Sequence, residues 1–413
     1  MPEPSDRKCL GCGVASPEIF LDLGRMPLAN AYLHSEADSE REERFPLAVA
    51  YCGRCHLVQL SETVAPEKMF SDYAYFSSYS DSFLAHARKM AESHIERFNL
   101  GPTSRVLEIG SNDGYLLQYF KRRGIEVLGV DPAANIAAAA NRKGLPTLCR
   151  FFNSDTAAEI VLKQGRADLM IGNNVLAHVP RINDFLGAVG ACLERDGVAA
   201  FEFPYLRELL DKTEFDTIYH EHVFYYSLSA IENLARRAEL ELFDVVRQPV
   251  HGGSLRVFLQ HPGVRPVEGR VERMLNQEQE SGLTRFAHYA SFGQRVLVLK
   301  EQLLSTLRAI SRAGKRIAAY GAPAKGNTLL NYCGIGRDLL EFTVDRSPHK
   351  QGMLLPGSHL PILPPQELLA RKPDYALILP WNIADEIIRQ QVNYLAAGGR
   401  FISPVPEPTI LTY

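Results

Sequence analysis

Residues 218–227 read IYHEHVFYYS, which puts two histidines, one glutamate and three tyrosines in one short segment. Histidine is the side chain whose ordinary pKa lies nearest neutrality, so it is a natural proton acceptor in catalysis. A tyrosine hydroxyl can donate a hydrogen bond to an oxygen on which negative charge develops. The composition therefore indicates a proton-transfer centre, with a hydrogen-bonded core network and a metal site as the alternatives.

The metal alternative rests on His220 and His222. The motif that binds zinc on a helix is H-E-x-x-H, whereas this segment reads H-E-H. With strand spacing, the two histidines would supply two ligands and no obvious third. The spacing therefore favours proton transfer over metal binding.

A separate metal signal comes from four of the seven cysteines, which form two C-x-x-C pairs. Each pair can place two thiolates on one side of a zinc ion, and two pairs complete a tetrahedron. No ligand position is then left for water, so the predicted zinc is structural. Four ordinary thiols or a redox pair are the alternatives. The predicted ligands are Cys9, Cys12, Cys52 and Cys55.

A glycine-rich turn is predicted in VLEIGSNDGYLLQYF, between a strand and a helix. Gly110 and Gly114 would let the backbone pass close to a ligand, and the next strand ends in Asp131, where an acid suits the hydroxyls of a ribose. A dinucleotide fingerprint needs glycine where Asn112 stands, and Asp113 would repel a phosphate. S-adenosylmethionine carries a sulfonium cation and no phosphate, so the loop favours this cofactor over NAD. A turn without a ligand is the remaining alternative.

Two further stretches supply candidate contacts to the cofactor. MIGNNVLAHVP predicts a strand that ends in polar residues facing the methionine portion, and RFFNSD, with Phe151 beside Phe152, lies where an adenine contact is expected. The predicted cofactor-binding residues are Glu108, Gly110, Asn112, Gly114, Asp131, Phe152, Asn153 and Asn173.

These motifs lie in a chain of 413 residues, which is long enough for two or three domains. Short apolar runs alternate with helical segments from residue 105 onward and again over 314–404, which predicts two parallel sheets. LELFDVVRQPVHGGSLRVFLQH predicts an antiparallel pair of strands added to the first sheet. We expect an α/β fold with a zinc-binding module (1–70), a class I, Rossmann-like methyltransferase domain with linking helices (71–266), and a helical linker followed by a C-terminal Rossmann-like domain (267–413).

The composition argues against several classes of protein. The net charge is −3 and no run is rich in lysine and arginine, which disfavours a nucleic-acid partner. No apolar run approaches the roughly 18 residues of a membrane span, and MPEPSDRKCLGCG lacks the apolar core of a signal peptide. We therefore expect a cytoplasmic protein with a small-molecule substrate, and nothing in the sequence requires more than a monomer.

In the order of these motifs, the chain resembles the zinc-containing nucleotide-sugar C-methyltransferases. The resemblance covers essentially the whole chain and is carried by the two cysteine pairs, VLEIGSNDGYLL, YHEHVFYYS and YGAPAKGNT, with GRMPLANAYL, YAYFSSYS and HGGSLRV in support. It implies transfer of a methyl group from S-adenosylmethionine to carbon 3 of a dTDP-linked 4-keto-deoxysugar in antibiotic biosynthesis. The sugar itself is left open. The alternatives are O- or N-methylation of another small molecule, an RNA-directed protein, and a non-catalytic nucleotide-sugar binding protein.

The resemblance also implies roles for individual residues. His222 would be the base that removes the proton beside the ketone, Tyr219 a substrate-positioning or proton-handling hydroxyl, and Glu221 a supporting acid, since a neighbouring carboxylate can hold the base in one tautomer. Lys325 would meet the nucleotide diphosphate, with a purely structural turn as the alternative. The predicted catalytic residues are His222, Tyr219, Glu221, His178, Tyr73 and Tyr75. The predicted substrate-binding residues are Asn30, Tyr79, His251, Ser254, Arg256 and Lys325.

Overall fold

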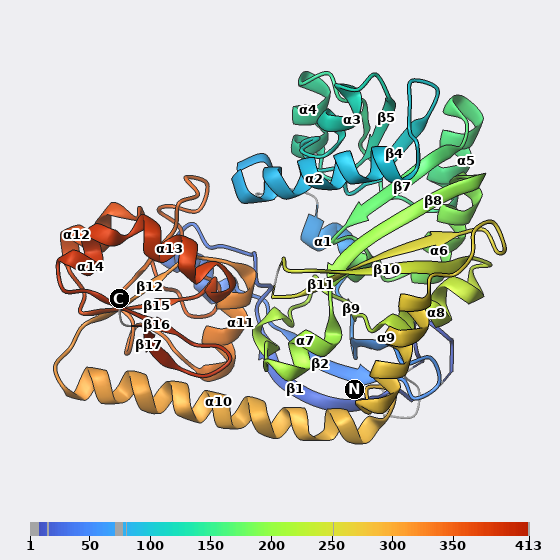
Figure 1. The fold of residues 1–413 in the computed structure, drawn as a ribbon. Coiled ribbons are helices and arrows are strands. Elements are labelled where there is room, and N and C mark those ends of the chain that lie inside the picture. The colour runs from blue at the N-terminus through green and yellow to red at the C-terminus, as the bar shows by residue number, and fades with distance from the viewer. Residues whose placement is uncertain (1–7, 15, 71–76, 80, 251, 412–413) are drawn as a thin grey trace.

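The computed structural model describes residues 8–14, 16–70, 77–79, 81–250 and 252–411. Sheets of four, seven and six strands organise the chain, and they lie in three parts of the ribbon (Figure 1). No helix of the described residues has the length and apolar character that a membrane span requires. The predicted α/β class and the order of its three parts are confirmed.

The N-terminal sheet is antiparallel and has the order β1-β2-β3-β9. Its strands are β1 (Glu18–Met26), β2 (Phe45–Tyr51), β3 (Val58–Leu60) and β9 (Phe224–Tyr225). Three of them belong to the cysteine-bearing segment, but β9 follows the H-E-H motif, and its Tyr225 pairs with Val58. The histidine segment is therefore held between the zinc-binding module and the methyltransferase domain.

The central sheet has the order β10-β11-β8-β7-β4-β5-β6. Its parallel strands are β4 (Arg105–Ile109), β5 (Glu126–Val130), β6 (Thr147–Leu148), β7 (Ala167–Asn173) and β8 (Leu193–Pro204). As predicted, β10 (Glu241–Gln248) and β11 (Ser254–Gln260) form an antiparallel pair, and β11 joins β8.

Helices cover both faces of this sheet, which explains why its parallel strands are nearly continuous apolar runs (Figure 1). On one face lie α2 (Asp81–Arg97), α3 (Leu117–Lys121) and α4 (Ala134–Arg142). On the other face lie α5 (Ser154–Gln164), α6 (Ile182–Cys192) and α8 (Leu228–Arg237). The carboxyl ends of β4, β5 and β7 meet at one edge, where the predicted cofactor residues lie.

The C-terminal sheet has the order β14-β13-β12-β15-β16-β17, and only β17 is antiparallel to its neighbour. Its strands are β12 (Ile317–Tyr320), β13 (Thr343–Val344), β14 (Ile362–Leu363), β15 (Tyr375–Ile378), β16 (Arg400–Ser403) and β17 (Thr409–Leu411). Its helices are α11 (Ala324–Cys333), α12 (Gln366–Arg371), α13 (Ala384–Gln390) and α14 (Val392–Ala396). Because β13 and β15 flank β12, the strand order reverses at β12, and ligands of such sheets commonly bind at that point.

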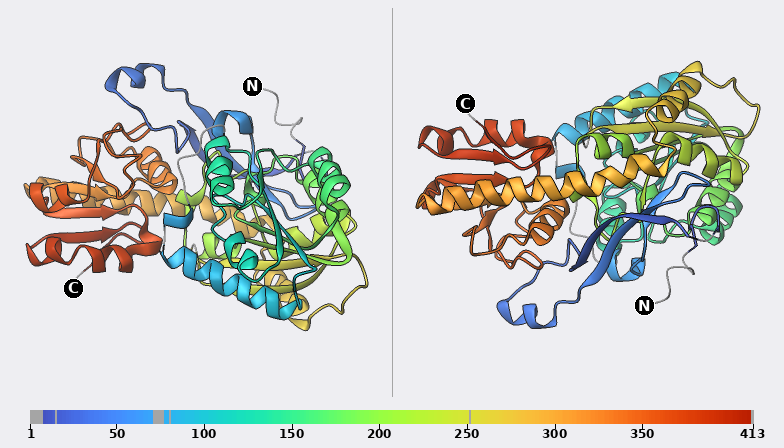
Figure 2. Two further views of the ribbon diagram at one scale, coloured as in Figure 1. Left: turned by 90° about the horizontal axis from the view of Figure 1, so that it is seen from above. Right: turned by 90° about the horizontal axis from the view of Figure 1, so that it is seen from below.

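Helices α9 (Gly269–Glu280) and α10 (Phe286–Arg312) connect the last two domains. The long α10 runs beneath the zinc-binding module and on to the C-terminal sheet (Figures 1 and 2). Tyr289 and Phe292 pack against Phe20 of β1, and one buried cluster continues from there into the C-terminal domain. The remaining elements are short: α1 (Pro66–Phe70), α7 (Leu206–Asp211), and the 3-10 turns η2 (Glu36–Arg41), η3 (Ser77–Tyr79), η4 (Leu176–His178), η5 (Phe215–Thr217) and η6 (Trp381–Ile383).

Candidate active site

The four paired cysteines converge on one point. Their sulfur atoms all lie within 4.8 Å of one another, with Cys9 3.5 Å from Cys55 and Cys12 3.6 Å from Cys52. Sulfurs that share one tetrahedral zinc at about 2.3 Å lie roughly 3.8 Å apart, so this set fits zinc. All four thiols are free of disulfides. Four sulfur ligands leave no site for water, which makes the metal structural.

Each cysteine pair is followed by a residue with positive φ that closes the turn. Gly13, with φ of 74°, donates its N–H to the carbonyl of Cys9, and His56, with φ of 62°, donates to that of Cys52. The first turn is also tied to the central domain, because Asn183 of α6 donates to the Gly11 carbonyl at 2.9 Å. The zinc site therefore fixes how the N-terminal module sits on the methyltransferase domain.

The glycine-rich turn after β4 has the backbone that its sequence demands. Gly110 and Gly114 have φ of 64° and 80°, a region that side chains disfavour. A Cβ on Gly110 would lie 2.6 Å from Val175, and a Cβ on Gly114 would lie 2.2 Å from Leu145. Both glycines are thus required by the protein's own packing, and their closeness to a ligand stays a prediction.

Two acids lie at the edge of the sheet beside this turn. Asp131 accepts hydrogen bonds from the N–H groups of Asn112 and Ala133, both at 3.0 Å. Glu108 is completely buried, and neither of its carboxylate oxygens has a well-oriented hydrogen-bond partner among the described residues. Burial raises the pKa of both acids, with the Tyr115 hydroxyl opposing the shift at Glu108. A buried carboxylate without a well-oriented partner fits a cationic ligand, and S-adenosylmethionine brings both an ammonium and a sulfonium group.

Asp113 does not act as the sequence suggested. Its carboxylate is 1% exposed and accepts a hydrogen bond from the Lys143 ammonium at 2.7 Å, and another from the Ser78 hydroxyl. Because Lys143 neutralises it, Asp113 is not the charge that would repel a phosphate. The preference for a cationic cofactor rests on Glu108 and Asp131 instead.

The other predicted cofactor residues have roles in the fold. Phe152 is buried edge-on against Phe185, whereas Phe151 is 41% exposed. The Asn153 side chain accepts from an N–H in the first turn of α5 and caps that helix. At the end of β7, Asn173 donates to the Tyr115 hydroxyl at 3.1 Å. Contacts of Phe152, Asn153 and Asn173 with the cofactor stay predictions.

The centre of the H-E-H segment is a tyrosine–histidine pair. The Tyr219 hydroxyl lies 2.8 Å from Nε2 of His222, and Nδ1 of His222 lies 3.2 Å from the Thr217 carbonyl. A carbonyl can only accept, so Nδ1 carries the proton, and Nε2 of the neutral ring is the acceptor for Tyr219. This is the tautomer in which Nε2 can take a proton from a substrate.

A second histidine lies beside this pair. The ring centres of His178 and His222 are 4.9 Å apart, and Nδ1 of His178 donates to the Glu221 carbonyl at 2.7 Å. Burial lowers the pKa of His178 to about 4, although that hydrogen bond opposes the shift. The structure thus brings together Tyr219, His222 and His178, as the sequence predicted.

The Glu221 carboxylate was expected to hold His222 in one tautomer, but the Thr217 carbonyl is the acceptor for Nδ1 of His222. Glu221 is 4% exposed and accepts from the Asn30 amide at 2.7 Å. Burial raises the pKa of Glu221 to about 7, opposed by Asn30 and by the Lys350 ammonium. Asn30, predicted to contact substrate, connects the zinc-binding module to the histidine segment.

The metal alternative at H-E-H is not supported. Nε2 of His220 lies 3.3 Å from the Phe45 carbonyl, and its ring packs edge-on against Phe45. Within the described ranges, the cysteine cluster is the one group of three or more histidines, cysteines and acids arranged to hold an ion. His220 therefore packs against the N-terminal sheet.

The predicted substrate-binding residues Ser254 and Arg256 both bond within the fold, and their contact with a substrate stays a prediction. The Ser254 hydroxyl donates to the Val250 carbonyl at 3.0 Å. Arg256 is 7% exposed, and its Nε and Nη2 atoms donate to one oxygen of Glu202 at 2.9 and 2.6 Å, while Nε2 of His86 lies 2.7 Å from the other. The charge of Arg256 is therefore already compensated.

Lys325 lies at the start of α11, near the point where the C-terminal strand order reverses. Its ammonium donates to Asn382 at 2.9 Å and lies 4.4 Å from the centre of the Trp381 ring. Burial lowers the pKa of Lys325, whereas the charges of Asp216 and Glu214 oppose this shift. Its contact with a diphosphate stays a prediction.

Tyr73, Tyr75, His251 and the side chain of Tyr79 lie outside the described residues.

Several residues near the site carried no clear sequence signal. The Ala322 carbonyl, in the turn after β12, accepts from the Tyr32 hydroxyl at 2.6 Å and from the Lys350 ammonium at 2.8 Å. Backbone carbonyls such as those of Ala322 and Thr217 exist at every position, so sequence cannot single them out. Trp381 is different, because it is the one tryptophan of the chain and follows a predicted strand.

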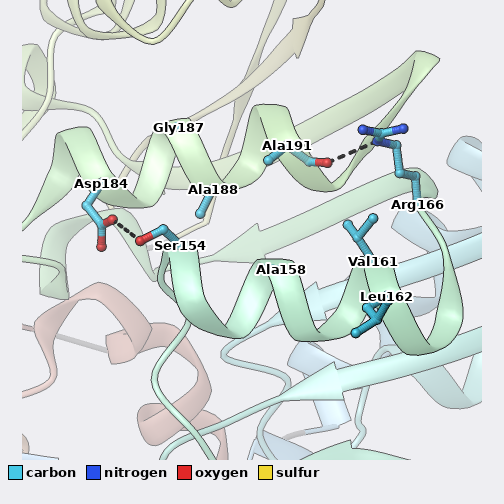
Figure 3. Close-up of a pocket in the computed structure, with 9 residues that line it drawn as sticks. All are labelled: Ser154, Ala158, Val161, Leu162, Arg166, Asp184, Gly187, Ala188 and Ala191. Carbon is cyan, nitrogen blue, oxygen red and sulfur yellow. Dashed lines mark hydrogen bonds between the residues drawn. The ribbon is translucent and has the colours of Figure 1, made fainter.

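A shallow hollow of about 500 Å³ lies elsewhere, between α5 and α6 (Figure 3). Its floor is mostly apolar, and Arg166 and Asp184 stand at its two ends. The Arg166 guanidinium donates to the Ala191 carbonyl and the Asp184 carboxylate accepts from Ser154, so both are engaged in the fold. None of the residues that line the hollow belongs to the tyrosine–histidine centre.

Comparison with known proteins matches each part of the chain in turn. A zinc binding domain model matches residues 9–70, a methyltransferase domain model residues 83–245, and a C-methyltransferase C-terminal domain model residues 249–406. The C-methyltransferase NovU of Streptomyces niveus is 39% identical over 97% of this chain and 96% of its own length. The chain belongs to the C-methyltransferase family. It is an S-adenosylmethionine-dependent transferase with a structural zinc site.

More distant relatives match only part of the chain. A ubiquinone biosynthesis O-methyltransferase of Rhodopseudomonas palustris (strain HaA2) is 36% identical over 23% of this C-methyltransferase and 37% of its own length. A solved S-adenosylmethionine-dependent methyltransferase from Clostridium acetobutylicum ATCC 824 is 14% identical, covers 43% of this chain and 91% of its own, and superposes with a TM-score of 0.35. That superposition is too weak to carry a further conclusion.

Proposed function

We propose that this C-methyltransferase adds a methyl group to carbon 3 of a dTDP-linked 4-keto-deoxysugar. The observation that carries the proposal is the tyrosine–histidine pair. The Nδ1–H group of His222 donates to the Thr217 carbonyl, which leaves Nε2 able to accept a proton. A carbon beside a ketone becomes a nucleophile only when a base removes its proton. O- and N-methylation start from atoms that already hold a lone pair and need no carbon base.

In this proposal, the proton leaves carbon 3 for Nε2 of His222, and the electron pair of the broken bond moves into the enolate. The Tyr219 hydroxyl gives up its bond to Nε2 and donates to the enolate oxygen, where the negative charge develops. Bound S-adenosylmethionine would supply the electrophilic methyl group, with the electron pair of the broken sulfur–carbon bond staying on its sulfur. Carbon 3 then carries the new methyl, the ketone is restored, and His222 returns its proton to solvent.

The remaining groups of the centre keep it neutral and ordered. His178 is held uncharged by burial, which avoids a second positive charge beside the imidazolium that His222 becomes. Glu221 joins the centre to Asn30 of the zinc-binding module. These contacts make the site a joint product of the N-terminal module and the methyltransferase domain.

The test is incubation with methyl-labelled S-adenosylmethionine and a panel of dTDP-linked 4-keto-deoxysugars, followed by mass spectrometry and NMR. A labelled methyl group bonded to carbon 3 is the expected result. Label on an oxygen or nitrogen of the sugar would overturn the C-methylation mechanism. If no sugar in the panel gains label while the cofactor binds, the substrate assignment is wrong and the family assignment stands.

A further inference from the structure

The carbonyl that orients His222 belongs to a turn held by the C-terminal domain. Thr217 is the last residue of η5, and α11 packs directly against this turn. The residues on either side of Thr217 each make a hydrogen bond to that domain. The peptide units that flank the Thr217 carbonyl are therefore anchored across a domain boundary.

The first anchor is Trp381. Its indole N–H donates to Oδ2 of Asp216 at 2.7 Å, and Asp216 is completely buried. Burial raises the pKa of Asp216 to about 6, while Lys325 and the indole oppose the shift. The Lys325 ammonium covers one face of the same indole ring. A buried carboxylate deprived of a donor is costly, so this bond strongly restricts where η5 can lie.

The second anchor is Thr328 of α11, whose hydroxyl donates to the Ile218 carbonyl at 3.0 Å. Thr328 is 1% exposed and Ile218 is equally buried, so water cannot readily replace this bond. The Thr217 hydroxyl is bonded back to the Glu214 carbonyl at 2.7 Å, which stiffens the same turn from within. The Thr217 carbonyl is thus left to point at Nδ1 of His222.

We propose that Trp381 and Thr328 are positioning residues for the base, and that through Asp216 and Ile218 they keep His222 in the tautomer with its proton on Nδ1. The catalytic consequence rests on the proposed function. When the Thr217 carbonyl moves away, Nδ1 loses its acceptor and the proton can reside on Nε2, which then cannot accept one from carbon. The C-terminal domain is by this account part of the proton-transfer machinery.

The experiment compares Trp381→Phe, Thr328→Val and the double variant with the wild-type chain. Phenylalanine keeps an aromatic ring for Lys325 to contact, but it lacks the indole N–H that donates to Asp216. The matched control is Thr306→Val, because the Thr306 hydroxyl on α10 donates to its own helix, at the Gln302 carbonyl. Circular dichroism and S-adenosylmethionine affinity report whether each variant is folded.

The decisive readout is ¹⁵N NMR of histidine-labelled protein, with His222 assigned by its absence in His222→Asn. The wild-type and Thr306→Val proteins are expected to show the Nδ1–H tautomer alone. The double variant is expected to show the Nε2–H tautomer as well, with kcat reduced about 10- to 100-fold and cofactor affinity unchanged. Each single variant, should the double variant fail to fold, is expected to show a smaller change in the same direction.

An unchanged tautomer and an unchanged kcat in folded variants would overturn the positioning role. The NMR measurement needs no sugar, so it separates this inference from the proposed function. A tautomer shift in a protein that methylates none of the sugars would leave the positioning role and remove the proposed substrate. Methylation of carbon 3 with no tautomer shift in the variants would support the proposed substrate and remove the positioning role.

Discussion

In the methyltransferase domain, the turn after β4 is tied to Asp131, which accepts from the N–H groups of Asn112 and Ala133 at 3.0 Å. In the C-terminal domain, the turn after β12 is tied to Asp345, which accepts from the N–H groups of Ala322 and Ser347 at 2.7 and 2.8 Å. Each acid follows the second strand of its sheet, and each turn begins with a glycine of positive φ. The two local structures are nearly the same.

The difference lies in what the protein leaves unused at each edge. Two positions before the glycine, the first turn has the buried Glu108, whose carboxylate lacks a well-oriented partner among the described residues, while the second has Ala319. In the second turn the Ala322 carbonyl is already bonded to Tyr32 and Lys350. We therefore expect the first turn to meet a ligand through Glu108, and the second turn to contact the zinc-binding module through Tyr32.

Glu108→Gln should have the largest effect on this comparison. We expect the affinity for S-adenosylmethionine to fall about 100-fold, or roughly 2.7 kcal/mol, because the neutral amide no longer attracts a cation. The ligand-free protein should be at least as stable as the wild type, because a buried carboxylate without a well-oriented partner is costly. Calorimetric titration and thermal unfolding measure both. An unchanged affinity would show that Glu108 is not a cofactor residue.

Replacing Asp131 and Asp345, the equivalent acids of the two turns, should affect cofactor binding differently. Asp131→Asn is expected to weaken cofactor binding about tenfold, whereas Asp345→Asn should leave it unchanged. Each variant loses one acceptor for a backbone N–H, so each should lose about 1–2 kcal/mol of stability. Equal losses of cofactor affinity in both variants would contradict the division of roles.

Lys325→Met tests whether the second turn also meets a ligand. If Lys325 contacts the diphosphate, KM for the nucleotide sugar should rise roughly fivefold, with the rise shrinking at high salt. The affinity for S-adenosylmethionine should not change. Steady-state kinetics at two ionic strengths measure this. A KM unaffected at either salt concentration would leave docking as the sole role of this turn.

Glu221→Gln should alter the pH dependence of stability. Since burial raises the pKa of Glu221 to about 7, the folded state binds this proton more tightly than the unfolded state. Its stabilising contribution is present below the ordinary carboxyl pKa and is lost as the pH rises through about 7, by roughly 3 kcal/mol at most. Thermal unfolding between pH 5 and 8 should therefore show a shallower decline in the variant. Parallel curves for the two proteins would contradict the shifted pKa.

The sequence was informative where function depends on residues close together in the chain. The cysteine spacing predicted the sulfur cluster, and the pattern around Gly110 and Asp131 predicted a glycine turn beside an acid. It was uninformative where contacts depend on strand register or on residues distant in the chain. Arg256 lies opposite Glu202 in the antiparallel pairing of β11 and β8, and this register is not visible in HGGSLRV.

The acceptor for Nδ1 of His222 shows the same limit. A neighbouring carboxylate was the natural expectation for His222, but a main-chain carbonyl takes that place, and every residue carries one. Which carbonyl is used depends on η5, and η5 depends on contacts with Trp381 and Thr328 from another domain. Chemical type can be inferred from sequence, whereas position across a domain boundary requires the fold.

The central claim is that His222 removes the proton from carbon 3, and it can be measured without methyl transfer. The protein is incubated in D₂O with a dTDP-linked 4-keto-deoxysugar and S-adenosylhomocysteine, and NMR follows deuterium at carbon 3. We predict that the wild-type protein exchanges this proton and that His222→Asn, folded and still able to bind cofactor, does not. Equal exchange by both proteins would contradict the assignment of His222 as the base.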